Sequence, residues 1–261
     1  MINANNLGIL NSLTELINSH YDSNNHAIAS YLVKNISHLD QITVNEIMDN
    51  AYVSRSAVRR FCEKLGYSSL ENLKTSFSKI IFPSDIRHRT KEDYQTNNVK
   101  LTNLIKNMLD DINSVFGVTE LNQIVDKIHN HNEVILLCAN NTSSTLVKFQ
   151  QEMIYANKII VVLDHKYRTS KYLKSLKPNS LLFTVSTSGK YAEVINDLIN
   201  ELPGDKMIIT GNRNKKLASS YNDVFYISQK SFSEDYLGIY GKYGITYLFD
   251  QIFLHYVNSY H

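Results

Sequence analysis

The stretch that decides the N-terminal fold is TVNEIMDNAYVSRSAVRRFCEKLG, residues 43–66. Its pattern predicts two short amphipathic helices joined by a tight turn. Thr43 is a suitable N-cap for the first helix, and Glu46 stands three residues later, where it completes a capping box. Ser54 offers a second N-cap, and Gly66 stands where a glycine commonly follows a helix. The stretch therefore predicts a helix-turn-helix.

The second of these predicted helices has an apolar stripe inside and a basic face outside. Arginine pairs with guanine edges in a major groove and also neutralises phosphates, so such a face suits DNA. Residues 54–91 hold nine Lys and Arg against three Asp and Glu, although the whole chain carries only +2. Such local charge favours attraction to phosphates. We expect a DNA-binding surface made of Thr43, Ser54, Arg55, Ser56, Arg59, Arg60 and Lys64.

Two other interpretations of this motif stay open. Helix pairs of this shape also occur in ordinary all-α packing, where exposed arginines are merely solvated. The pair could also serve dimerisation in a structural or interaction protein. Alanine at Arg55 and Arg59 separates these cases, because only a DNA reader loses operator binding with its fold intact.

Length and composition limit the class of protein. A chain of 261 residues with 43% hydrophobic and 20% charged residues is expected to form two globular domains. Cys62 and Cys138 lie far apart in apolar patterns, so we expect neither a disulfide nor a zinc site. No signal-peptide pattern opens the chain, and no apolar run approaches the ~20 residues of a membrane span. The expected protein is soluble, cytoplasmic and free of membrane partners.

The hydrophobic pattern divides the chain into three parts. Residues 1–82 read as all-α, and the charged stretch 83–100, which opens with a helix-breaking proline, reads as a linker. Residues 101–261 begin with helical spacing and then alternate helical patterns with short apolar runs. Runs that are apolar on both faces indicate a parallel sheet covered on both sides. We expect a doubly wound α/β domain with five strands near residues 134–138, 159–163, 180–185, 207–209 and 224–227, closed by a helix over 239–259.

Small hydroxyl residues crowd the ends of the first and third expected strands. Residues 140–145 read NNTSST and residues 186–190 read STSGK, and each run leads into a helix. Ligands of open parallel sheets bind beyond the carboxyl ends of the strands, where free helix N–H groups attract anions. The two runs predict a phosphate site, although Ser, Thr and Asn also cap helices without any ligand. The expected ligand residues are Asn141, Ser143, Ser144, Ser186, Thr187, Ser188 and Lys190.

Two motifs resemble a known family. VSRSAVRRFCEKLGY at residues 53–67, followed by Leu70, Leu73 and Lys74, is similar to the helix-turn-helix of the RpiR-type bacterial transcription regulators. VSTSG at residues 185–189, with Glu193 beyond it, resembles the phosphate loop of sugar isomerase (SIS) domains. The resemblance implies a homodimer or tetramer that reads a palindromic operator and senses a phosphorylated sugar, without a cofactor. It implies that Ser54, Arg55, Ser56, Arg59 and Arg60 face DNA, and that Ser143, Ser144, Ser186, Thr187 and Ser188 hold the phosphate.

Departures from the family pattern and an enzymatic alternative accompany this resemblance. SIS domains usually carry glycines in the loop after the first strand, but residues 138–142 have none, and Tyr191 stands where a threonine is usual. A regulator whose sensor domain has lost ligand binding is therefore one alternative. A sugar-phosphate isomerase or lyase is another, since Glu152 and Glu193 fall near the ligand runs. These carboxylates form no recognisable catalytic set, so we expect no catalytic residues. His129 and His131 are expected in a polar turn rather than a metal site.

Overall fold

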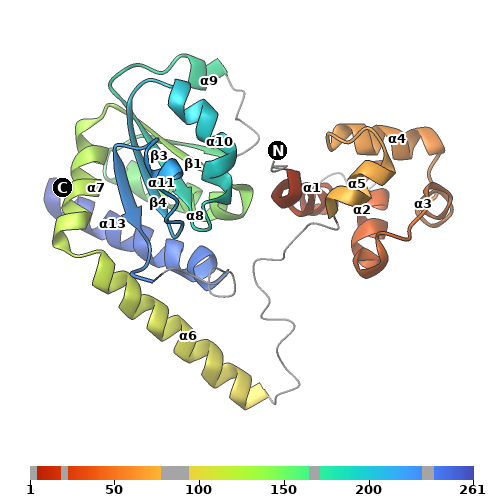
Figure 1. Ribbon diagram of the computed structural model, residues 1–261, viewed down its shortest axis with the longest axis horizontal. Helices are drawn as coiled ribbons and strands as arrows, with labels where there is room; N and C mark the ends of the chain where they lie inside the picture. Colours follow the sequence, from red (N-terminus) through yellow and green to blue (C-terminus); the bar gives the residue numbers. More distant parts are fainter. Residues whose placement is uncertain (1–4, 19–22, 78–93, 165–170, 231–237) are drawn as a thin grey trace. The chain divides into compact units, whose positions relative to one another are not determined.

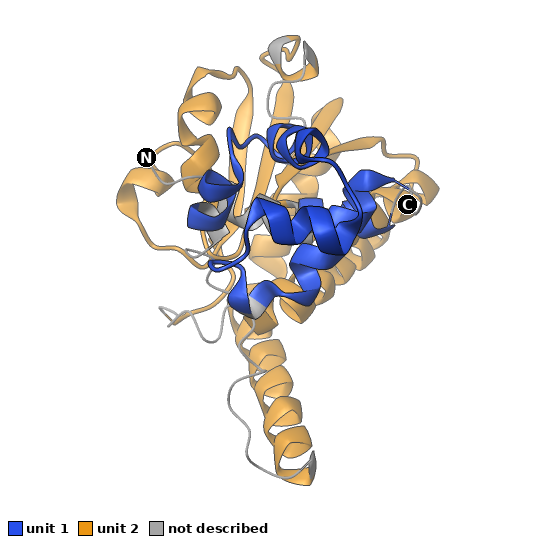
Figure 2. Cartoon of the chain, turned by 90° about the vertical axis from the view of Figure 1, so that its right-hand side faces the viewer, with its two compact units in different colours: residues 1–81 blue, residues 82–261 orange. Residues whose placement is uncertain are grey.

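The computed structural model describes residues 5–18, 23–77, 94–164, 171–230 and 238–261. The chain divides into two units, residues 1–81 and 82–261 (Figure 2). Each unit has a hydrophobic core of its own. Helix α6 begins at Tyr94, so residues 94–100, which the sequence pattern placed in a linker, are helical. The described part of the chain contains no helix that combines the length and the hydrophobicity needed to cross a membrane.

The described residues of the N-terminal unit form helices and no strand, as predicted. Its core gathers the apolar faces of its helices around side chains such as Ile28, Ile47 and Phe61, none of which is accessible to solvent. The elements are α1 (Asn5–Asn18), α2 (Asn24–Lys34), the 3-10 helix η1 (Ile36–His38), α3 (Val44–Ala51), α4 (Arg55–Lys64) and α5 (Leu70–Phe77).

Local signals fix the two helices of the motif. Thr43 Oγ1 accepts a hydrogen bond from the Glu46 N–H at 3.2 Å, and Glu46 Oε2 accepts one from the Thr43 N–H at 2.6 Å, so the predicted capping box is present. Ser54 Oγ accepts from the Ala57 N–H at 3.2 Å and caps α4. Gly66 follows α4 with φ +84°, a conformation that a glycine adopts without strain. Both caps and the glycine are therefore as predicted.

The second unit is built on a five-stranded, all-parallel sheet in the order β2-β1-β3-β4-β5. Every predicted apolar run overlaps one of its strands, although Ile159 and Ile227 lie one residue outside β2 and β5, and the expected fold class is confirmed. Strands lie on either side of β1 because the chain goes from β1 to β2 on one side and then returns past β1 to β3 on the other, which is the doubly wound arrangement. The strands are β1 (Glu133–Cys138), β2 (Ile160–Asp164), β3 (Ser180–Ser186), β4 (Asp205–Thr210) and β5 (Asp223–Tyr226).

Helices cover both faces of this sheet (Figure 1). Successive residues of β1 show why: Val134 and Leu136 belong to one core cluster, and Ile135 and Leu137 belong to the other. The first cluster is covered by α6 (Tyr94–Val115), α7 (Val118–Asn130), α8 (Asn140–Tyr155) and α13 (Ile245–Tyr260). The second is covered by α9 (Lys171–Lys174), α10 (Lys190–Glu201) and α11 (Lys215–Ala218).

Two features of this unit were not predicted. The expected final helix is present, but it opens with a π-helical turn, η4 (Tyr240–Gly244), before α13. At the amino edge of the sheet, Lys127 of α7 forms ion pairs with Asp205 and with Asp223, the latter at 2.6 Å. This lysine joins α7 to the first residues of β4 and β5, so it holds the helix against the sheet.

Both cysteines are buried in cores. Burial raises the pKa of the Cys62 thiol to about 11 and that of the Cys138 thiol to about 12. Thiols with such values are protonated at neutral pH, and they behave as small apolar side chains.

Candidate DNA-binding and ligand-binding sites

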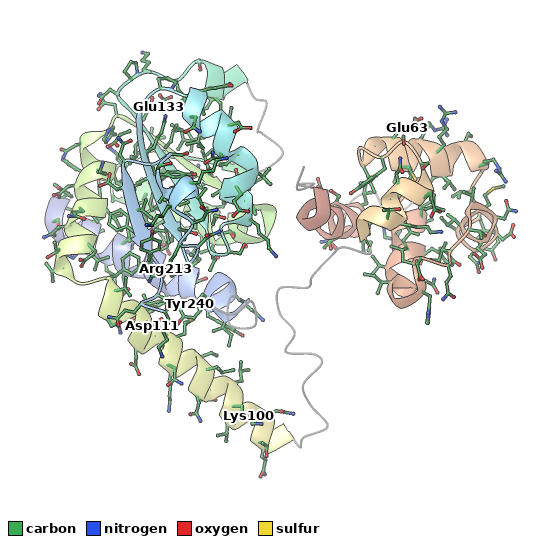
Figure 3. All side chains as sticks on the ribbon, viewed as in Figure 1. Glu63, Lys100, Asp111, Glu133, Arg213 and Tyr240 are labelled. Carbon is green, nitrogen blue, oxygen red and sulfur yellow. The ribbon has the colours of Figure 1, made fainter. Side chains whose placement is uncertain are left out.

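The expected DNA-binding residues lie at or near the two helices of the helix-turn-helix. Val58 and Phe61 are buried on the inner side of α4, with exposures of 2% and 0%. The opposite side of the helix therefore faces solvent, as the stick view of the unit shows around Glu63 (Figure 3). All seven expected residues are exposed: Thr43, Ser54, Arg55, Ser56, Arg59, Arg60 and Lys64.

Side-chain contacts connect several of these exposed residues to one another and to their neighbours. Arg55 Nη2 donates to Asn45 Oδ1 of α3 at 2.8 Å, which links the two helices of the motif across its outer face. Arg59 Nε lies 2.8 Å from Glu63 Oε1, one helical turn along α4. Ser54 Oγ and Ser56 Oγ are 2.9 Å apart at the start of the helix. Asn45 and Glu63 were missed by the sequence reasoning, although the Arg-Glu spacing of four residues was a usable signal.

The basic stretch extends beyond the motif. Four of its cations lie outside the residues that the structure describes: Lys79, Arg87, Arg89 and Lys91. Their share in the expected surface therefore stays a prediction.

The first expected ligand loop is a helix. Residues 140–145 form the opening turns of α8, which begins directly after Ala139 in extended conformation. The Thr142 N–H already bonds the Ala139 carbonyl at 3.0 Å. No glycine separates strand from helix here, so the chain turns straight into α8. The expectation of a loop was wrong for residues 140–142, whereas Ser143 and Ser144 lie on the helix that the sequence pattern indicated from residue 143 onward.

The second expected run, residues 186–190, is a loop that enters α10. Ser186 ends β3 and is buried, and its Oγ accepts a hydrogen bond from the Ala192 N–H at 3.3 Å. Ser188 Oγ accepts from the Lys190 N–H at 3.4 Å. Both hydroxyls thus serve the helix N-terminus, as the capping interpretation expected. Each can still donate its own proton, because a hydroxyl accepts and donates at once.

Residues beyond the motif lock this loop in place. Gly189 has φ +77°, and a Cβ added there would collide with the side chain of Asn212. Asn212 Nδ2 donates to Glu193 Oε1 at 3.0 Å, and the Gly211 N–H bonds the Thr187 carbonyl at 2.8 Å. Glu193 therefore holds the loops after β3 and β4 together. The sequence placed Asn212 after the fourth strand, but only the parallel pairing of β3 with β4 brings it to Glu193.

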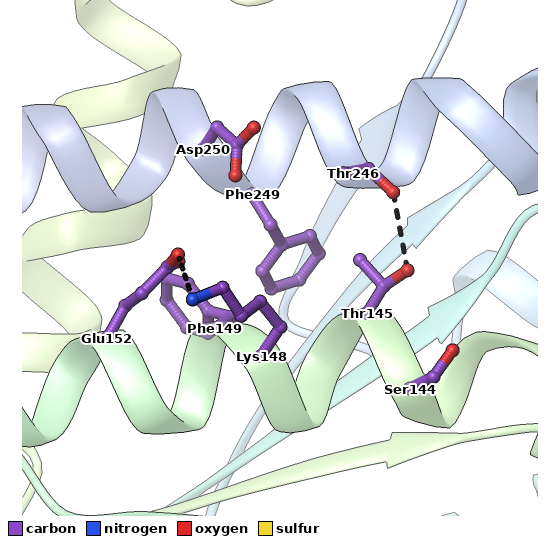
Figure 4. Close-up of a pocket in the computed structure, with 8 residues that line it drawn as sticks. All are labelled: Ser144, Thr145, Lys148, Phe149, Glu152, Thr246, Phe249 and Asp250. Atoms are coloured by element: carbon purple, nitrogen blue, oxygen red, sulfur yellow. Dashed lines mark hydrogen bonds and ion pairs between the residues drawn. The ribbon is translucent and has the colours of Figure 1, made fainter.

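A pocket of about 250 Å³ opens between α8 and α13 (Figure 4). Phe149 and Phe249 form its apolar part, with their rings edge to face at 4.9 Å. Lys148 Nζ lies 3.4 Å from Glu152 Oε1, and burial together with Glu152 raises the pKa of Asp250. Of the expected ligand residues, this pocket contains Ser144. It is lined by Ser144, Thr145, Lys148, Phe149, Glu152, Thr246, Phe249 and Asp250.

The two histidines near β1 have separate structural partners. The His129 ring stacks on Tyr260 with centroids 3.7 Å apart. His131 Nδ1 lies 2.8 Å from the Lys127 carbonyl oxygen. His129 lies in the last turn of α7 rather than in a turn between elements. Within the described ranges, no group of three or more His, Cys, Asp or Glu side chains is placed to hold a metal ion.

The N-terminal unit matches a known family. Residues 9–82 match the family profile of the helix-turn-helix domain of the rpiR family. The chain is 23% identical over 175 residues to an uncharacterized HTH-type transcriptional regulator, TTE0211, of Caldanaerobacter subterraneus subsp. tengcongensis. That alignment covers 64% of this chain and 61% of the relative, so the chain spans less than two thirds of the relative's length.

Solved structures share the fold at low sequence identity. The Vibrio vulnificus NanR protein complexed with ManNAc-6P has a TM-score of 0.50 at 15% identity, with 95% of this chain and 92% of that chain covered. The c3406 protein of E. coli CFT073, which was also solved as a complex, has a TM-score of 0.51 at 13% identity, with 65% and 95% covered.

The fold and the profile together define a class: a helix-turn-helix domain joined to a doubly wound α/β domain. The resemblance seen in the helix-turn-helix motif is confirmed. Residues 9–82 form a helix-turn-helix domain of the rpiR family, and the chain as a whole shares its fold with the NanR structure.

Proposed function

We propose that this protein is a transcription regulator that binds operator DNA through α4 and responds to a phosphorylated sugar held by its SIS-like domain. The observation that carries the proposal is the surface of α4. A capped helix presents three exposed arginines on the face opposite a fully buried stripe, within an rpiR-type motif. A helix with these features fits a major groove, where its N-terminal residues reach the base edges.

The proposed DNA contacts divide by chemistry. Thr43 and Ser54 stand at helix N-termini, where hydroxyls and free N–H groups bind phosphates. Arg55, the first residue of α4, and Arg59, about one turn later, are proposed to read base edges. The remaining proposed contacts, with phosphates and neighbouring bases, are Ser56, Arg60 and Lys64.

The proposed phosphate site lies at the carboxyl edge of the sheet. The helix N-termini of α8 and α10 follow neighbouring strands, β1 and β3, so their N–H groups serve one edge. Gly189 leaves room for the side chain of Asn212, which fixes the loop that is proposed to receive the phosphate. Ser144 also lines the α8–α13 pocket, and we place the sugar there. The proposed ligand residues are Asn141, Ser143, Ser144, Ser186, Thr187, Ser188 and Lys190.

We further propose a cytoplasmic homo-oligomer. An rpiR-type motif reads a short half-site, and two copies are needed for a palindromic operator whose half-sites lie about 34–36 Å apart or a multiple of that. In such an assembly the sugar phosphate controls the spacing between the two copies of α4. A small rotation of one subunit is enough to move its α4 out of register with the DNA half-site. Scattering profiles that are identical with and without the sugar phosphate on the dimer would contradict this mechanism.

An isomerase is the second candidate, because Glu152 and Asp250 place two carboxylates in the α8–α13 pocket. An isomerase needs a general base free to take a proton from the sugar. Glu193 is held by Asn212, and Glu152 is paired with Lys148, which supports the non-catalytic proposal. Turnover of a sugar phosphate by the full-length chain, lost in Glu152→Gln, would instead favour the enzyme.

The deciding experiment is fluorescence anisotropy on DNA from upstream of the protein's own gene, titrated with a panel of sugar phosphates. We expect salt-sensitive, sequence-specific binding that one sugar phosphate shifts. Alanine at Arg55 and Arg59 should each reduce affinity by about tenfold or more. Binding that is independent of sequence and of both arginines would contradict the proposal.

A paired variant tests the sensor separately. Gly189→Ala should abolish the response to the sugar phosphate and leave DNA affinity unchanged, because the added Cβ displaces Asn212. Gly117→Ala is the control, since a Cβ there meets the side chain of Glu120 at 3.3 Å and none of the proposed ligand residues. An unchanged response in Gly189→Ala would contradict the proposed site.

A further inference from the structure

Helices α3, α4 and α8 end in the same way. In each, a backbone N–H bonds a carbonyl five residues earlier at 2.9–3.1 Å, as in a Schellman motif: Val53 to Met48, Tyr67 to Cys62 and Lys158 to Met153. The residue before that N–H takes a left-handed conformation in all three. It is Gly66 after α4, Asn157 after α8 and Tyr52 after α3, with φ of +84°, +54° and +54°.

Tyrosine is the exception in this set. Glycine has no Cβ, and asparagine tolerates left-handed angles, so Gly66 and Asn157 are the residues that this position favours. Tyrosine carries a steric penalty there, because its Cβ approaches the carbonyl oxygen. Burial of the side chain does not offset this penalty, since Tyr52 is 93% exposed. Neither the backbone nor the core of the unit therefore accounts for a tyrosine at this position.

The position of Tyr52 points to a partner outside the chain. The residue forms the turn between α3 and α4, two residues before the Ser54 cap and three before Arg55. Its N–H bonds the Met48 carbonyl, so the backbone that carries the ring is fixed. Strain that a fold maintains at one exposed residue is a marker of function.

We propose that the Tyr52 hydroxyl donates a hydrogen bond to a DNA phosphate at the edge of the major groove that receives α4. The inference rests on the proposed function of this surface. A phenol is a good donor to phosphate oxygen, and the rigid ring holds the hydroxyl at a set distance from the turn. Such a contact positions α4 on the duplex and carries no sequence information. Tyr52 is thus a positioning residue beside the arginines.

The test is Tyr52→Phe in the full-length chain, since it removes the hydroxyl and keeps the ring and the backbone angle. Tyr155→Phe is the matched control, because Tyr155 is 83% exposed and lies on α8 of the other unit. Anisotropy is measured on a duplex that the wild type enriches from a random-sequence pool, and on a scrambled duplex. We expect Tyr52→Phe to weaken both by the same factor, about 3- to 10-fold, with an unchanged salt slope, because no charge is lost. Tyr155→Phe should change neither.

A second variant shows whether Tyr52 acts through a contact with DNA or through the stability of the fold. Tyr52→Gly removes the ring and relieves the left-handed strain, so its thermal midpoint should equal or exceed that of the wild type while DNA affinity falls at least as far as in Tyr52→Phe. A less stable Tyr52→Gly chain, or a Tyr52→Phe affinity within twofold of the wild type, overturns the contact. A wild-type chain that enriches no duplex overturns the proposed function itself, and the contact with it.

Discussion

Arg59 and Glu63 lie one turn apart on the outer face of α4, and their ion pair is exposed, with side-chain exposures of 77% and 49%. Exposed pairs contribute little to stability, so the pair matters for the charge that α4 presents. Glu63 cancels one positive charge on the surface that is proposed to approach phosphates. At the scale of the residue, we therefore expect this carboxylate to limit DNA affinity.

Replacing Glu63 by Gln tests this role. We expect Glu63→Gln to raise DNA affinity by about 3- to 10-fold at low salt and to steepen the salt dependence by about one phosphate contact. Glu71→Gln is the matched control, because Glu71 is also exposed and paired, with Lys74 on α5. A fall in specific affinity in Glu63→Gln would show instead that the carboxylate accepts a hydrogen bond from a base.

Single residues at helix ends were the most predictable part of the candidate site. Thr43, Ser54 and Gly66 act within a few residues of themselves, so sequence spacing alone identifies their roles. Glu193 differs, since its position in a motif was visible but its partner Asn212 was not. Contacts between residues far apart in sequence depend on which strands pair.

At the scale of the element, helix α3 depends on its capping box. The pKa of Glu46 is lowered, first by the hydrogen bond from the Thr43 N–H and then by that from its hydroxyl. A carboxyl whose pKa is lower in the folded state stabilises above its unfolded pKa, about 4.5, and the contribution is lost as pH falls through the folded value. The start of the helix-turn-helix should therefore weaken in acid.

The variant Glu46→Gln makes this pH dependence measurable. We expect its thermal midpoint to lie below that of the wild type at pH 7 and the two to converge in acid, as the pH falls through the lowered pKa of Glu46 and its carboxyl becomes protonated. The comparison is made by differential scanning calorimetry across that range. A gap that is the same at every pH would show that the charge of Glu46 contributes nothing to the cap.

Two helical elements differ from what the sequence patterns predicted. The run at residues 140–145 was rich in loop-forming residues, but α8 starts at once after β1. Residues with hydroxyl and amide side chains are common both at helix N-termini and in loops, so composition could not distinguish a helix start from a loop. The π-helical turn η4 gave no signal either, because its residues also fit an α-helix.

At the scale of the whole molecule, the two units have separate cores. The helix-turn-helix core draws on residues before 74, and both clusters of the C-terminal α/β unit draw on residues after 103. A unit that buries its own apolar surface can fold without the other.

Expressing residues 82–261 alone tests this independence. We expect the fragment to unfold cooperatively, with the same sugar-phosphate affinity as the full chain and no affinity for operator DNA. Circular dichroism and calorimetry report folding, and titration of the sugar phosphate reports the site. A fragment that folds and binds DNA specifically would place the reading surface outside α4.

The amino-acid sequence was sufficient to predict the two-unit organisation, the helix-turn-helix with its caps, the five parallel strands and the exposed basic face of α4. These follow from local periodicity and from hydrogen bonds between near neighbours, which act in any chain of this sequence. The folded chain was needed to show that Asn212 locks the Gly189 loop, that Arg55 is held by Asn45, that Lys127 bridges β4 and β5, and that a mixed-charge pocket opens between α8 and α13. Those contacts join residues brought together by strand order and helix packing, and no spacing along the chain encodes them.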